Sequence, residues 1–147
     1  MAFNAGFTKY QKKKWLDALA AIGTMRIAIY STTTALDAFQ DPASPLVYSS
    51  TGELTGSGTG YNNTGVAGTT GYALSGATVS ANGNGYQLSW NDVITGSGTI
   101  AAGTYGAMIY DTADSNRVAA VLSVTVSTGS SSGTMTFDIP ANALTVS

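Results

Sequence analysis

The chain has 147 residues, no cysteine and no histidine, and only 10% of its residues are charged. Without cysteine it has no disulfide framework and no thiolate metal site, and without histidine it lacks the usual general base and the commonest metal ligand. A hydrophobic fraction of 44% is typical of a folded chain. We expect a single domain over 1–147, with an N-terminal helical part (1–23) and a β part (24–147).

The charge is unevenly distributed along the chain. Residues 1–26 carry five basic and one acidic side chains, whereas the remaining residues carry one basic and seven acidic ones. This basic cluster fits a solvated helix face or docking on an acidic protein partner better than nucleic acid, which needs a broader patch. We expect no membrane association, because no apolar run approaches the length of a transmembrane helix. The run after the lysines is short and contains Asp17, so we also expect no signal peptide.

Residues 7–22 are predicted to form an amphipathic helix that ends before Gly23. The apolar residues at helical spacing are Trp15, Ala18, Leu19 and Ile22, broadened by Phe7 and Tyr10. Lys13 and Asp17 can form an ion pair on the opposite side. Two interpretations of the apolar face stay open. It packs on the protein's own sheet, or its aromatic residues anchor on a neighbouring subunit.

Short runs of alternating apolar and polar residues dominate the rest of the chain. The predicted strands lie at 24–31, 46–50, 72–80, 86–91, 104–111, 117–127 and 134–139, and an extended segment closes the chain. Asn-Gly pairs at 82–85 are a strong hairpin signal. The fold class predicted is mainly β, an antiparallel β-sandwich or barrel-like domain of about seven or eight short strands with one N-terminal amphipathic α-helix.

A glycine-rich segment, 51–71, separates the first strands from the later ones. Its seven glycines allow turns and close backbone approach, and we interpret it as a long functional loop. Its run Gly-Ser-Gly-Thr-Gly at 56–60 lacks the Gly-Lys-Ser/Thr ending of a phosphate-binding loop, and no helix is predicted after it. The run is therefore not expected to bind a nucleotide.

Other patterns that resemble catalytic motifs also have simpler explanations. Residues 129–133 match the G-x-S-x-G pattern of serine hydrolases, but the chain has no histidine base, so they are predicted to form a polar turn. Asp111, Asp114 and Asn116 have neither the spacing of a calcium loop nor that of carboxylates facing each other across a cleft, and a β-turn is predicted there. We expect no catalytic, cofactor or metal site.

Several aromatic residues lie at strand positions and are candidates for the core, for an interface or for a sugar-stacking platform. They are Tyr61, Tyr72, Tyr86, Trp90, Tyr105 and Tyr110.

The order of segments resembles a family of small structural proteins of tailed bacteriophages. A Lys/Trp/Leu helix precedes the strand MRIAIYS, and then come LVYSSTGELTGSGTGYNNTGVA, YALSGATVSANG, YQLSWNDVITGSGTI, YGAMIYD and RVAAVLSV. The resemblance covers residues 7–146. The residues that match as written are Glu53, Gly58, Gly60, Tyr61, Trp90, Asp92, Ile100 and Tyr110. The segment NNTGVAGTTG departs from the pattern, because relatives are shorter there.

This resemblance implies a virion protein without enzymatic activity or cofactor. The function expected is that of a capsid decoration (cement) protein, which bridges neighbouring major capsid subunits, often as a homotrimer, and stabilises the head. The alternative is a tail fibre, tip or other tail-associated protein that binds host-surface glycans through exposed Tyr and Asn residues, with Tyr61, Asn62 and Asn63 as candidates. A third possibility is a bacterial carbohydrate-binding module. The partner-binding residues predicted are Phe7, Tyr10, Lys12, Lys13, Trp15, Glu53, Gly58, Gly60 and Tyr61.

Overall fold

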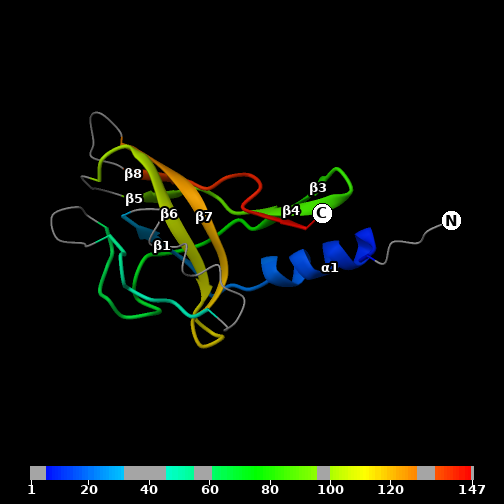
Figure 1. Ribbon diagram of the computed structural model, residues 1–147, viewed down its shortest axis with the longest axis horizontal. Helices are drawn as coiled ribbons and strands as arrows, with labels where there is room; N and C mark the ends of the chain where they lie inside the picture. The colour runs from blue at the N-terminus through cyan, green and yellow to red at the C-terminus, as the bar shows by residue number, and fades with distance from the viewer. Residues whose placement is uncertain (1–5, 32–45, 55–60, 96–99, 129–134, 147) are drawn as a thin grey trace.

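The computed structural model describes residues 6–31, 46–54, 61–95, 100–128 and 135–146. These residues form one helix and nine strands in two antiparallel sheets (Figure 1). The elements are α1 (Lys9–Ala20), β1 (Met25–Tyr30), β2 (Tyr72–Ala73), β3 (Thr78–Asn82), β4 (Gly85–Ser89), β5 (Val93–Thr95), β6 (Gly103–Asp111), β7 (Arg117–Thr128), β8 (Met135–Asp138) and β9 (Leu144–Val146). The predicted fold class, mainly β with one N-terminal helix, is confirmed.

The larger sheet has six strands in the order β2-β1-β6-β7-β8-β5 and is strongly curled. The ring of Tyr72 on β2 lies 5.4 Å from that of Phe137 on β8, although three strands separate β2 from β8 in the sheet. The curl therefore turns one face of the sheet inward, and this inner face holds the main hydrophobic core.

Strict alternation along β1 distributes its side chains over the two faces of the sheet. Ile27 and Ile29 lie in the main core, whereas Ala28 and Tyr30 belong to a second buried cluster on the outer face. Such two-sided burial is unusual for an antiparallel strand. Here it follows from chain segments that cover the outer face.

The pairing of β6 with β7 contains a bulge that extends the outer cluster. Ile109 pairs with Ala120, but the next residue, Tyr110, pairs with Val118, so Ala119 is the extra residue. Without the bulge, Val118 would share the inner face with Ala120, because side chains alternate with a period of two. With it, Val118 packs against the outer cluster around Tyr110.

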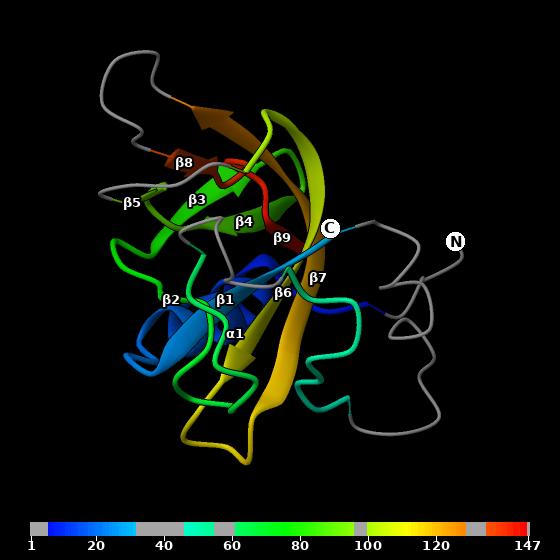
Figure 2. The ribbon, with the colours of Figure 1, turned by 90° about the vertical axis from the view of Figure 1, so that its left-hand side faces the viewer.

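The covering segments are 46–54 and 61–71, which run beside the large sheet and come forward in Figure 2. The amide of Leu54 donates to the Ile29 carbonyl (2.9 Å), and that of Tyr48 donates to the Asn116 carbonyl (2.8 Å). The prediction of an edge strand at 46–50 is wrong, because this segment forms only an isolated bridge, Val47 to Arg117.

The smaller sheet, β3-β4-β9, lies beside α1 (Figure 1). β3 and β4 form the predicted hairpin, and Gly83 begins its two-residue turn with a φ of 55°. Thr8 caps the helix by accepting a hydrogen bond from the Gln11 amide (3.2 Å).

The buried side of α1 differs from the prediction. Leu16 is 4% exposed, and Leu19, Ala20 and Ile22 pack against the core beside it, whereas Trp15 is 41% exposed. The apolar residues of this short segment fit two overlapping helical stripes. The sequence pattern alone therefore did not decide which stripe faces the sheet.

Candidate functional site

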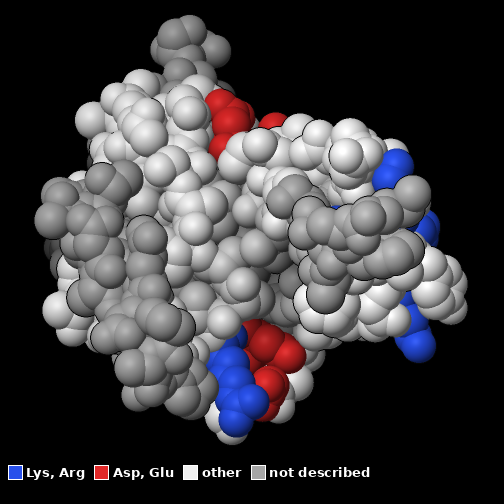
Figure 3. All heavy atoms as spheres, turned by 45° about the vertical axis from the view of Figure 1, so that its right-hand side comes forward, with Lys and Arg blue, Asp and Glu red and all other residues white. Residues whose placement is uncertain are grey.

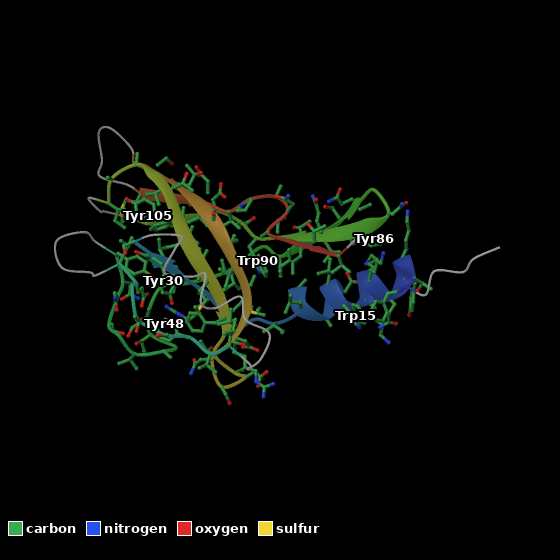
Figure 4. The ribbon with its side chains drawn as sticks, in the orientation of Figure 1. Trp15, Tyr30, Tyr48, Tyr86, Trp90 and Tyr105 are labelled. Carbon is green, nitrogen blue, oxygen red and sulfur yellow. The ribbon has the colours of Figure 1, made fainter. Side chains whose placement is uncertain are left out.

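Three aromatic side chains near the start of α1 are exposed to solvent. The exposed fractions are 62% for Phe7, 74% for Tyr10 and 41% for Trp15. The rings of Phe7 and Trp15 pack edge to face with centroids 4.3 Å apart. Trp15 projects on the side of α1 away from β4 (Figure 4). These two rings therefore present one continuous aromatic surface.

Tyr10 is placed apart from this pair. It precedes Trp15 by five residues, which corresponds to about 140° around the helix axis. Lys12 precedes Trp15 by three residues and thus neighbours it on the helix surface. We call Phe7, Lys12 and Trp15 the helix-end patch. Tyr10 and Lys13, the other predicted partner-binding residues of this segment, lie on other sides of α1, and Lys13 pairs with Asp17.

Blue side chains lie at the same end of the molecule, at the right-hand edge of Figure 3, and a second blue group lies beside red side chains at the bottom of the view. Lys13 forms the predicted ion pair with Asp17 (2.6 Å), and Lys9 donates to the Gly83 carbonyl (3.2 Å). The first turn of α1 has no acidic residue and its last turn has no basic one. This arrangement opposes the helix macrodipole, which favours cations at the C-terminus. The helix macrodipole therefore does not account for the position of these lysines, of which Lys13 and Lys9 have partners within the chain.

Glu53 and Tyr61, two further predicted partner-binding residues, lie inside the protein. Their exposed fractions are 5% and 3%, and the Tyr61 hydroxyl donates to Glu53 Oε1 (2.7 Å). The Tyr48 hydroxyl donates to Glu53 Oε2 (2.5 Å), and the Ile29 amide donates to the Tyr61 oxygen (2.8 Å). The prediction that these two side chains contact a partner is wrong for this conformation, because their polar atoms bind other parts of the same chain.

Burial determines the pKa values in the cluster formed by Glu53, Tyr48, Tyr61 and the neighbouring Tyr30. It raises the pKa of the Glu53 carboxyl group above its usual value, against the lowering effect of the hydrogen bonds from Tyr48 and Tyr61. It also raises the pKa of Tyr30, Tyr48 and Tyr61, and the neighbouring Glu53 charge adds to each shift. These phenols therefore act as hydrogen-bond donors at neutral pH.

Sequence reasoning missed the roles of Tyr30 and Arg26 on the outer face, and it named Tyr110 only as one of several aromatic candidates. Tyr30 donates to the Ser49 carbonyl (2.5 Å), and Tyr110 donates to the Thr70 carbonyl (3.0 Å). Arg26 was counted with the basic cluster, but it donates to the Thr70 and Gly71 carbonyls (both 2.8 Å). The alternation of β1 puts Arg26 and Tyr30 on one face of the strand, and this pattern could have indicated from the sequence that the two residues act together. Gly58 and Gly60 lie outside the described residues.

The residues proposed to bind glycans are also used internally. Asn62 donates to the Thr69 and Gly71 carbonyls (2.8 and 3.1 Å), and Asn63 donates to the Leu54 carbonyl (2.7 Å). Tyr61 is buried and offers no ring face to a sugar. These three residues together therefore do not form an exposed stacking platform.

The predicted turn between β6 and β7 is confirmed, and one acidic side chain, that of Asp111, helps to hold it. Asp111 accepts from the Ala113 amide (2.9 Å), and the Arg117 amide donates to the Asp114 carbonyl (2.9 Å). Within the described ranges, no group of three acidic, histidine or cysteine residues is placed to hold a metal ion. In the part of the chain that the structure describes, the one helix, α1, is too short and too polar to cross a membrane.

Two small hollows lie near the start of β1. One, of about 230 Å³, is lined by Arg26 and Thr112 among others, and the other, of about 210 Å³, by Leu19 and Asp111 among others. Ligand pockets usually occupy roughly 300–1,000 Å³. Both hollows are smaller than that, so the helix-end patch is the stronger candidate site.

No protein-family model, no curated protein and no solved structure matches this chain.

Proposed function

We propose that this protein is a non-enzymatic structural component of a tailed-bacteriophage virion. Its proposed role is that of a capsid decoration (cement) protein, located on the capsid surface, which bridges neighbouring major capsid subunits and stabilises the head. The order of sequence segments supports the phage assignment. The helix-end patch supports the docking role, and it is the observation that carries the proposal.

Exposed aromatic residues are typical of protein interfaces, whereas lysines belong to the polar rim. Trp, Tyr and Arg dominate interface energetics, and burying such rings on a partner contributes most of the binding energy. Phe7 and Trp15 already pack on each other, so little side-chain entropy is lost when a partner covers them. The lysines favour an acidic partner surface and speed association with it. We propose the major capsid protein as this partner, with a second copy of the chain, in a trimer, as a further contact.

The glycan-binding alternative, a tail fibre or tip protein, has less support. Tyr61, Asn62 and Asn63, the residues suggested for it, make hydrogen bonds within the chain. No described contact favours a sugar over a protein surface at the helix-end patch. Decoration is therefore the function we propose.

The first test is the copy number of the protein in separated heads and tails of the source particles. Decoration predicts many copies on heads, because each capsid offers many equivalent subunit junctions. A few copies on tails alone would contradict it, and absence from both would contradict the virion assignment itself.

The second test compares variants in binding to capsids that lack the protein. The Phe7→Ala/Trp15→Ala variant should bind at least about 30-fold more weakly, as expected for loss of an interface hot spot. Ile94→Ser is the matched control, since Ile94 is 70% exposed on β5 and lies outside the patch. Equal binding by the two variants would contradict docking through the helix end.

A further inference from the structure

We propose that Glu53 is a proton-sensitive latch, which holds segments 46–54 and 61–71 against β1 of the large sheet more tightly when its carboxyl group is protonated. This inference concerns the folded chain alone and is independent of the proposed function.

Both covering segments meet at Glu53. Tyr48 from the first segment and Tyr61 from the second donate to its two carboxylate oxygens, at 2.5 and 2.7 Å. Next to it, the Leu54 amide donates to the Ile29 carbonyl of β1 (2.9 Å). The carboxyl group thus joins both segments where they lie against β1, and Asn63 donates to the Leu54 carbonyl (2.7 Å) as a second contact between them. A change in its charge acts on both segments together.

Phenol groups surround this carboxyl group on every packed element. They are Tyr30 on β1, Tyr110 on β6, Tyr48 and Tyr61. The nearby cation, Arg26, donates to the carbonyls of Thr70 and Gly71. Within the described residues, Glu53 forms no salt bridge. Its negative charge is therefore buried with hydroxyl donors alone, which compensate less than a cation would.

Protonation changes this arrangement without breaking it. The proton comes from solvent, and the new carboxyl O–H can donate to the Tyr48 oxygen, 2.5 Å away. The Tyr48 oxygen then accepts from Glu53, its own O–H turns to the Thr70 side chain with which it already shares a hydrogen bond, and Tyr61 continues to donate to Glu53. The buried charge disappears and both segments stay joined.

The direction of the pH effect follows from the same geometry. Burial raises the pKa of Glu53 in the closed form, whereas in an opened segment it returns to the usual value of about 4.3. Between these two values the closed form binds more protons than the open form, so closure weakens as pH rises. The opening equilibrium constant increases by up to about tenfold per pH unit in this window and is constant above it.

Hydrogen exchange of the Leu54 amide tests the latch, because this amide reports separation of segment 46–54 from β1. Its opening constant, corrected for the intrinsic exchange rate, is measured between about pH 4 and 8. We expect it to rise with pH in the wild-type protein and to be constant in Glu53→Gln. A constant value in the wild type, or an equal rise in Glu53→Gln, would overturn the proposal.

Two further variants keep the test decisive if Glu53→Gln does not fold. Tyr48→Phe keeps the carboxyl group but removes one donor, so the rise should extend to higher pH. Asp92→Asn is the matched control, since the exposed Asp92 accepts from the Ile139 amide (2.8 Å) and lies outside the cluster. Its Leu54 profile should equal that of the wild type. An unshifted profile in Tyr48→Phe, or a lost rise in Asp92→Asn, would also overturn the latch.

Discussion

The Tyr61 hydroxyl donates a 2.7 Å hydrogen bond to Glu53 where both side chains are almost completely buried. The same hydroxyl accepts a hydrogen bond from the Ile29 amide of β1 (2.8 Å). One phenol oxygen thus satisfies a buried backbone donor and a buried acid, which joins the glycine-rich region to the first strand.

Replacing Tyr61 with phenylalanine should lower the free energy of unfolding by about 2–3 kcal/mol, because the Ile29 amide and Glu53 each lose a partner in a buried environment. Urea denaturation measures the change. Tyr105→Phe is the control, since its hydroxyl donates to the exposed Ala101 carbonyl (2.9 Å), and it should cost less than about 1 kcal/mol. Equal losses in the two variants would show that the Tyr61 network contributes little.

Gly71 and Gly65 form a matched pair for testing close backbone approach. Their φ angles are 67° and 68°, but a Cβ at Gly71 would lie 2.0 Å from the Ile27 carbonyl oxygen, whereas nothing lies within 4 Å of one at Gly65. Gly65→Ala should cost about 1–2 kcal/mol, from the left-handed conformation alone. Gly71→Ala should cost more than about 4 kcal/mol, since β1 must move. Thermal unfolding of both variants compares them, and similar melting temperatures would contradict the close approach.

The two sides of α1 should respond differently to truncation. Leu16→Ala leaves a cavity in the core and should cost about 3 kcal/mol in unfolding free energy. Trp15→Ala removes a partly exposed ring and should cost about 1 kcal/mol. Chemical denaturation of both variants checks this. A loss from Trp15→Ala as large as that from Leu16→Ala would mean that the ring is needed for folding and not reserved for a partner.

Alkaline pH should unfold the protein cooperatively. The pKa values of Tyr30, Tyr61 and Tyr110 are raised, mainly by burial, so the folded state holds these protons longer than the unfolded chain. Stability should therefore fall as pH rises above about 10, the usual pKa of tyrosine. Tyrosinate absorbance and far-ultraviolet circular dichroism should change together. Ionisation of all tyrosines before any loss of secondary structure would contradict their burial.

The sequence by itself determined the local elements and their class. Helical spacing before Gly23 located α1, the two-residue alternation located most of the strands, and the Asn-Gly pairs at 82–85 marked the β3–β4 hairpin. These features depend on residues that are close in sequence, so the local residue pattern was sufficient to predict them. The single strand predicted at 72–80 was wrong, because β2 and β3 are separate strands in different sheets. The segment around Val47 was predicted to be a strand but forms only an isolated bridge. A short apolar run after a proline has no periodicity that distinguishes a strand from an extended loop segment.

Only the tertiary structure decided which side chains are available to a partner. Trp15 and Leu16 are adjacent apolar residues on one helix, and packing against the smaller sheet buried Leu16 and left Trp15 at the surface. Glu53 looked like an exposed loop residue until the curled sheet and two distant segments enclosed it. The reason is physical: burial depends on contacts between residues far apart in sequence, which a local pattern of residue types does not specify.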